Sequence, residues 1–417
     1  MSGIFTRRGL LQGSAALAAA GALGTPRKAR AAAGERKFLF LFASGGWDPT
    51  TVLDPHFDSD KVDMDPDTEL GSLGSLTYTG GDPRMDVSRF FSRWGRQCAI
   101  VNGVDVHSVG HESARQFVMT GTSASSFADW PTTIAYHSQV EYALPHLVFS
   151  GPSYAGTYGS VVAQAGGGTL LDLMDGSLLG RSERPAPIPA SPADSMVDAF
   201  VYGQAARFAD GKKGLSRDRA EALVGSLERT MELEGRLFEA GLNDLGNDML
   251  DQCIRAVEVM RLGLTRCSMV GIPGGWDSHG DNTVQAVQQT DMYMVLDQLF
   301  EHMSVTPGSS TRWLIDEVVV VAMSEIGRTP LLNGSGGKDH WPFTSYLVAG
   351  SGVNGGRTVG ATDPGLVGLP VSFSTGRESD SGDMLACENV GAALLELAGL
   401  DPQQHLPDVQ VFDAILG

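Results

Sequence analysis

The stretch Gly271–Asn282, GIPGGWDSHGDN, places Asp277, His279 and Asp281 within five residues on a glycine-rich loop. Carboxylate and imidazole groups that alternate in this way can converge on one divalent cation. Solvated turns also carry such residues. The metal interpretation of Asp277 and His279 therefore depends on what the rest of the chain can bring beside them.

A second group of polar residues follows the apolar run Ile315–Met323, which predicts a strand buried on both faces of a parallel sheet. Ligands bind just outside the carboxyl ends of the strands in an open α/β sheet. A solvated loop after the strand is the alternative for each residue taken alone. We expect the metal ligands Glu325, Asp339 and His340 here, and an anion-binding Arg328.

A third acid, Asp48, follows the predicted strand Lys37–Ala43 through the sequence Gly-Gly-Trp-Asp, which recurs at 274–277. Three acids follow predicted strands, and two of them lie near a histidine. This repetition favours a shared site over a chance arrangement. Asp48 is therefore a further predicted metal ligand.

The predicted strand Cys98–Val104 leads into a polar helix start within 106–120. Helix N-termini favour anions through their free amides and dipole. A nucleophile or a phosphate-type group would be stabilised there, so His111, Ser113 and Arg115 are candidate catalytic residues. A simple polar cap is the alternative for Ser113.

The elements that must position these residues predict an α/β fold, a doubly wound and mostly parallel sheet sandwiched by helices. Amphipathic helices are expected over 283–303 and 384–399, and a strand toward the sheet edge over 345–350. A Gly- and Pro-rich segment at 166–195 and a helical stretch from 193 to 267 predict an insertion near 166–267.

Residues 1–33 are typical of a twin-arginine signal peptide, with Arg7-Arg8 before an apolar segment and cleavage sites after Ala31 or Ala33. A membrane anchor is the alternative, but the apolar run is too short to span a bilayer. We expect a mature domain over 34–417, without a transmembrane segment. The export machinery would carry it folded to the periplasm or beyond.

The net charge limits the classes of binding partner, and the cysteine spacing bears on disulfide formation. The net charge is −19, and removing the five basic residues of 1–33 leaves 25 basic against 49 acidic residues, or −24. Such a surface argues against nucleic acid and anionic membranes. An anionic substrate would need a local positive centre, such as a metal or Arg115 and Arg328. The scattered cysteines favour buried free thiols, although one or two pairs stay open: Cys98, Cys253, Cys267 and Cys387.

The motifs GGWD, GGWDSHGDN, SEIGRTP and GKDHWP, together with the N-terminal signal, resemble the family catalogued as domain of unknown function 1501. That family looks like a branch of the alkaline phosphatase and sulfatase superfamily. The resemblance covers the whole mature chain. It implies one or two divalent ions (zinc, manganese, calcium or iron) at the strand ends and a nucleophile at a helix N-terminus that attacks a phosphate or sulfate ester. By motif, Asp48, Asp277, His279, Glu325 and His340 match superfamily ligand positions.

Three departures from the superfamily pattern bear on the chemistry. His111 aligns with the nucleophile, no cysteine stands where a formylglycine would form, and Ile326 replaces a histidine ligand. These departures suggest a single metal, or a pair arranged differently with His111 as a ligand. A metal-activated water is then an alternative to a protein nucleophile. The sequence predicts an exported metal-dependent hydrolase or transferase. A non-catalytic binding or assembly protein that keeps the fold is the alternative, and a redox enzyme lacks any cofactor fingerprint.

Overall fold

The computed structural model describes residues 35–165, 192–210 and 245–417, and the single positions 213, 214, 217, 224 and 242. The predicted signal at 1–33 and most of the 166–195 segment lie outside the described residues. The structure therefore leaves the predictions made for those segments untested.

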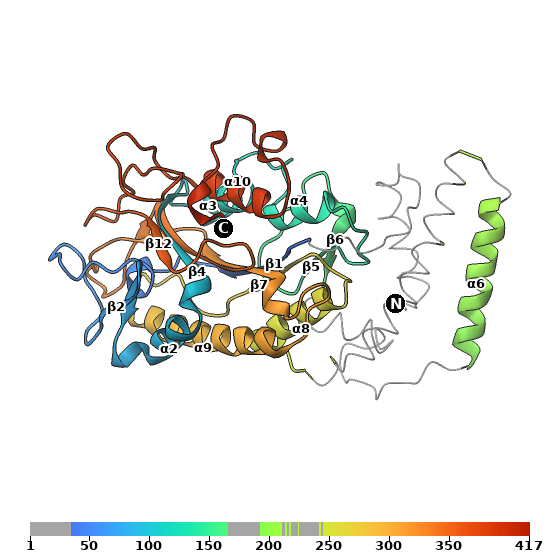
Figure 1. The fold of residues 1–417 in the computed structure, drawn as a ribbon, viewed down its shortest axis with the longest axis horizontal. Helices are drawn as coiled ribbons and strands as arrows, with labels where there is room; N and C mark the ends of the chain where they lie inside the picture. Colours follow the sequence, from blue (N-terminus) through green and yellow to red (C-terminus); the bar gives the residue numbers. More distant parts are fainter. Residues whose placement is uncertain are drawn as a thin grey trace.

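A central eight-stranded sheet organises the chain (Figure 1). Its spatial order is β12 (Arg357–Gly360), β4 (Cys98–Asp105), β11 (Phe343–Gly350), β8 (Val318–Ser324), β1 (Lys37–Ala43), β7 (Cys267–Gly271), β5 (His146–Val148) and β6 (Val162–Gln164). All neighbouring pairs are parallel except those of β11 with β4 and β8. Since β11 runs against both neighbours, β4 and β8 point the same way. The carboxyl ends of β4, β8, β1 and β7 therefore lie along one edge of the sheet.

Helices cover both faces of this sheet, as Figure 1 shows. The alternation of side chains along β1 sends Leu39, Leu41 and Ala43 into one core and the phenylalanines between them into the other. The first core holds α2 (Met85–Trp94), α8 (Met249–Arg261) and α9 (Thr283–Val305); the second holds α3 (His111–Thr120), α4 (Trp130–Tyr136) and α10 (Cys387–Leu397). The predicted α/β class with a mostly parallel sheet between helices is confirmed.

One strand prediction was wrong in its place. The segment expected toward the edge is β11, which lies in the sheet interior between β4 and β8. It is buried over Thr344–Ala349 and hydrogen-bonded on both sides. The hairpin of β9 (Gly327–Arg328) with β10 (His340–Trp341) reverses the chain after β8, so that β11 returns antiparallel beside it.

Shorter elements complete the described chain. A second hairpin pairs β2 (Glu69–Leu73) with β3 (Leu76–Gly80), and α6 (Pro192–Asp210) is a helix of the predicted insertion. No described helix has the length and apolar character needed to span a membrane. The 3-10 segments are η1 (Pro49–Thr51), η2 (Asp82–Arg84), η3 (Gly95–Gln97), η4 (Gly159–Val161), η7 (Leu314–Asp316), η8 (Pro402–Gln404) and η9 (Asp413–Ile415).

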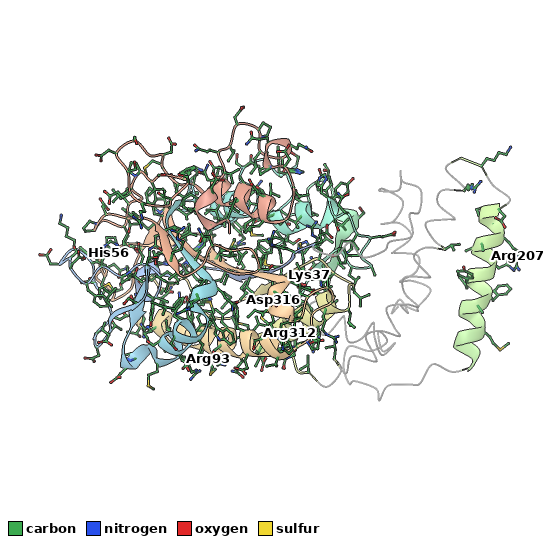
Figure 2. All side chains as sticks on the ribbon, viewed as in Figure 1. Lys37, His56, Arg93, Arg207, Arg312 and Asp316 are labelled. Atoms are coloured by element: carbon green, nitrogen blue, oxygen red, sulfur yellow. The ribbon has the colours of Figure 1, made fainter. Side chains whose placement is uncertain are left out.

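A buried ion pair joins the start of β1 to the segment before β8, at the amino end of the sheet. Lys37, labelled in Figure 2, places Nζ 2.5 Å from Glu317 Oε2, and both side chains are almost fully enclosed. Burial raises the pKa of Glu317, but hydrogen bonds from Lys37, Ser309 and the Ser310 amide outweigh it and lower the pKa to about 2.

Candidate metal centre at the carboxyl ends of the strands

Three potential ligands from distant parts of the sequence meet at the carboxyl edge of the sheet. His111 is the first residue of α3, which follows β4, Asp277 lies on the loop after β7, and His340 begins β10 just before β11. One ligand atom from each lies within 4.8 Å of the other two. The topology brings them together because four parallel strands end at this edge.

His279 joins the same group. Its Nε2 lies 2.9 Å from His340 Nε2 and 3.1 Å from Asp277 Oδ1. His340 Nε2 is 3.2 Å from Asp277 Oδ1, and His111 Nε2 is 3.5 Å from Asp277 Oδ2. We call His111, Asp277, His279 and His340 the strand-end cluster.

The other ring nitrogen of each histidine meets an acceptor. His111 Nδ1 lies 3.0 Å from Glu325 Oε1, His279 Nδ1 lies 2.9 Å from Asp339 Oδ1, and His340 Nδ1 lies 2.7 Å from the Val109 carbonyl oxygen. The two carboxylates, when ionised, and the carbonyl can only accept a hydrogen bond. Each neutral imidazole therefore carries its proton on Nδ1 and turns an Nε2 lone pair toward Asp277.

Lone pairs and a carboxylate that face one another repel unless a proton or a cation lies among them. His111 Nε2 is buried without a hydrogen-bond partner among the described residues. Zinc–nitrogen bonds of about 2.0–2.1 Å place neighbouring ligand atoms of a tetrahedral site about 3.3 Å apart, close to the 3.1, 3.2 and 3.5 Å that separate Asp277 oxygens from the Nε2 atoms of His279, His340 and His111. Histidine ligands whose Nδ1 is held by a carboxylate or carbonyl are typical of metal sites. The cluster fits a divalent cation.

Glu325 and Asp339 were expected to be ligands, but the structure places them behind the histidines of the cluster. Glu325 is fully buried after β8, where Oε1 accepts hydrogen bonds from the Gly45 amide at 2.8 Å and from His111. Asp339 accepts from His279 and from Asn333. Both carboxylates orient a histidine rather than lie in the cluster itself.

Arg328 has a different place from the anion-binding one predicted. It is fully buried and donates to the backbone carbonyls of Gly45, Gly46, Trp276 and Lys338 and to Asp277 Oδ1 at 2.8 Å. These donors tie together the loops after β1, β7 and β9. Arg328 therefore positions the cluster, and none of its nitrogens is left for a substrate.

Asp48 does not join the strand-end cluster, contrary to the prediction. Its Oδ1 accepts from the amide and hydroxyl of Thr50 at the start of η1, while Oδ2 accepts from Asn282 at 2.8 Å and from Lys338 Nζ at 2.8 Å. This buried ion pair explains the acid at the end of β1. Asp281 likewise accepts from Thr283 and starts α9.

Partial burial raises the pKa of Asp277, but the hydrogen bond from Arg328, together with the contact to His340 and the Arg328 charge, outweighs it and lowers the pKa to about 2. Asp277 is accordingly ionised at neutral pH although half of its side chain is exposed. Among the residues that the structure describes, it is the one carboxylate that faces all three Nε2 atoms.

Arg115 and Ser113 flank the cluster on α3. Arg115 Nη1 donates to Glu112 at 3.0 Å and Nη2 lies 3.7 Å from Glu325 Oε1, while its Nε has no partner among the described residues. Ser113 is exposed in the first turn of the helix. Of the two predicted anion-binding arginines, Arg115 is the one with a partly exposed side chain, at 22% against 0% for Arg328.

Sequence reasoning missed Lys338 and Asn333 as well as the Val109 carbonyl. Lys338 is fully buried against Asp48 and Thr50, although a lysine in a glycine-rich loop is normally solvated. The GKDH motif next to His340 was the available signal for Lys338. No sequence pattern marks a backbone carbonyl such as that of Val109.

A model of one protein family matches residues 35–411, which span nearly all of the described chain. The chain belongs to that family, protein of unknown function (DUF1501). A search of curated proteins gave no match. Among solved structures, this DUF1501 chain is similar to the PH0037 protein from Pyrococcus horikoshii at 12% identity and a TM-score of 0.29, over 76% of this chain and 88% of that one. This similarity is too low to support an argument about fold or function.

Proposed function

We propose that this DUF1501 protein is an exported metal-dependent hydrolase or transferase that acts on a phosphate or sulfate ester. The observation that supports the proposal is the convergence of three Nε2 atoms on Asp277, each with its Nδ1 held by an acceptor. The motif resemblance to the alkaline phosphatase superfamily and the strand-end position of the cluster agree with this reading.

The donor set narrows the choice of cation. Three imidazoles and one carboxylate suit zinc, iron or manganese better than calcium, which prefers six to eight oxygen ligands. Zinc also tolerates the low coordination number that four side chains offer.

A divalent cation bound by the strand-end cluster would supply Lewis acidity toward an ester oxygen and activation of a water molecule. The chain's own residues prepare the rest. Arg115 and the N-terminus of α3 attract an anionic group to the cluster. Ser113 is an exposed hydroxyl at the same helix start and is the candidate if a protein nucleophile is used. Glu325 and Asp339 keep the histidines in the tautomer that a cation needs.

The experiment is elemental analysis of the mature chain purified after export, beside His279→Ala and a matched control, His302→Ala. His302 lies on α9, where it pairs with Glu258 at 2.8 Å, away from the cluster. We expect one equivalent of metal less in His279→Ala than in the parent and in His302→Ala. The same metal content in all three proteins would contradict the assignment of the strand-end cluster.

Turnover is tested on the metal-loaded parent with aryl phosphate and aryl sulfate esters. Hydrolysis that disappears in Asp277→Asn supports the proposal. A metal-loaded, folded protein that turns over none of these esters favours the second candidate, a binding or assembly module. The observation behind that candidate is that His111 joins the metal cluster where a hydroxyl nucleophile would be expected.

A further inference from the structure

A second set of three different ligand types lies near the carboxyl end of β4. His107 Nε2 is 2.9 Å and 3.2 Å from the two carboxylate oxygens of Glu388, and Cys387 Sγ is 3.4 Å from Glu388 Oε2. One atom from each residue lies within 4.8 Å of the other two. We call His107, Cys387 and Glu388 the β4–α10 cluster.

Two elements hold the β4–α10 cluster in place. Cys387 and Glu388 open α10, whose approach segment is pinned to β4 by the hydrogen bond from the Asp105 amide to the Leu385 carbonyl. His107 follows β4 with a φ of +59°, in the left-handed region that few non-glycine residues adopt. Its amide donates to Asp105 Oδ1 at 2.7 Å, which fixes this turn and aims the ring at Glu388.

The surroundings combine a closed and an open side. Cys387 is 1% exposed, whereas His107 and Glu388 are partly open to solvent, so a cation could enter from their side. Tyr346, on the neighbouring strand β11, is fully buried and its hydroxyl has no hydrogen-bond partner among the described residues. Burial raises the pKa of the Tyr346 phenol well above its usual range, and the charge interactions with Cys387 and Glu388 are the next largest causes. Hydrogen bonds within the cluster do not satisfy this hydroxyl.

We propose that His107, Cys387 and Glu388 form a second divalent-cation site with one thiolate, one imidazole and one carboxylate ligand. This mixed set with a thiolate favours zinc over calcium or magnesium. Binding releases the Cys387 thiol proton to solvent, and the proton between His107 and Glu388 leaves with it. The site stands independently of the strand-end cluster, although both draw on the segment 105–111.

The test is titration of the metal-stripped full chain with Co²⁺, followed by its absorption spectrum. A thiolate ligand to cobalt gives an intense near-ultraviolet charge-transfer band, which the sulfur-free strand-end cluster cannot give. We expect the band in the parent and in Asp277→Asn. It should vanish in Cys387→Ala and persist in the matched control Cys253→Ala, which removes a buried thiol of α8 in the opposite core. The amount of cobalt bound per chain, measured by equilibrium dialysis, should fall from two equivalents in the parent to one in Cys387→Ala.

Absence of the band in the parent, or its survival in Cys387→Ala, would overturn the proposal. X-ray absorption of the zinc-loaded parent gives the same decision without substitution, should Cys387→Ala not fold. We expect a sulfur neighbour of zinc at about 2.3 Å. Zinc with nitrogen and oxygen neighbours alone would reject the β4–α10 site while leaving the strand-end site intact. If Asp277→Asn loses one equivalent of metal but keeps the thiolate band, the strand-end site is lost while the β4–α10 site remains, which separates the two proposals.

Discussion

At the scale of single residues, the strand-end cluster depends as much on the groups behind the histidines as on the histidines. Glu325 is fully buried and holds His111 Nδ1, while Asp339 is exposed and holds His279 Nδ1. A buried acceptor fixes a ring more firmly than an exposed one, since water can replace the latter. Replacing Glu325 should therefore weaken metal binding more than replacing Asp339.

We expect Glu325→Leu to weaken metal binding by about 10- to 100-fold, the usual effect of removing a hydrogen-bond partner of a histidine ligand. Glu325→Gln keeps an oxygen that can accept from His111 and should lose less. Competition with a chelator measures both variants. Equal affinities in the parent and Glu325→Leu would show that His111 is not a ligand.

Arg115 should act on substrate rather than on the metal. Its side chain is 22% exposed and lies beside Glu325, which makes it an accessible cation near the cluster. We expect Arg115→Ala to weaken binding of inorganic phosphate or sulfate by about 1.5–3 kcal/mol, the range for a hydrogen bond to a charged group, with metal content unchanged. Isothermal titration measures this. Arg312→Ala is the control, because Arg312 packs on Trp313 and touches none of the cluster; an equal loss there would mean a general charge effect.

At the scale of elements, the residues of the strand-end cluster lie at or beyond the ends of strands, and hydrogen bonds from Arg328 connect the loops. Its guanidinium reaches carbonyls after β1, β7 and β9 from a fully buried position. A planar fork of five donors can satisfy several carbonyls at once, which one ammonium group cannot do.

We expect Arg328→Lys to lower the free energy of unfolding by about 2–4 kcal/mol, because buried carbonyls lose their donors, at about 1–3 kcal/mol for each unsatisfied group with partial relaxation. Urea unfolding measures the change. The variant should also lose metal affinity, since Asp277 loses its Arg328 hydrogen bond. A fully stable Arg328→Lys protein would mean that the loops hold their places without this residue.

At the scale of the whole molecule, the two ends of the sheet are specialised differently. The carboxyl edge carries the partly exposed strand-end cluster, while the amino edge is closed by the buried Lys37–Glu317 pair. The free energy of unfolding should therefore respond to acid through Glu317. Its pKa of about 2 in the folded state lies below the value of about 4.3 for an unfolded chain. The stabilisation is complete above pH 4.3 and is lost as the pH falls toward 2.

We expect the free energy of unfolding of the parent to fall by on the order of 2 kcal/mol through this group between pH 5 and 2. In Glu317→Gln this part of the pH dependence should disappear, although the variant is less stable at neutral pH because Lys37 is left unpaired. Urea unfolding at a series of pH values measures both curves. Parallel curves for the two proteins would show that Glu317 is not the responsible group.

The sequence alone determined the α/β class and the residues that end the strands. Continuous apolar runs such as 38–43 and 318–323 are explained by burial on both faces, a property that local composition carries. Asp277, His279 and His340 could be singled out because their motifs follow such runs. Residue types thus singled out side chains that face one another in the structure.

Only the tertiary structure decided which residues touch. Asp48 and Asp277 share the same Gly-Gly-Trp-Asp context, yet one is paired with buried Lys338 and the other faces three histidines. Glu325 and Arg328 were predicted to bind the metal and an anion, but they lie behind the cluster, whereas His111 lies within it. These places could not be predicted because the hydrogen-bond partners come from segments far apart in the sequence. The antiparallel position of β11 and the meeting of His107 with Cys387 and Glu388 likewise depend on strand order. Pairing between distant segments is set by packing of the whole sheet, which local sequence patterns do not encode.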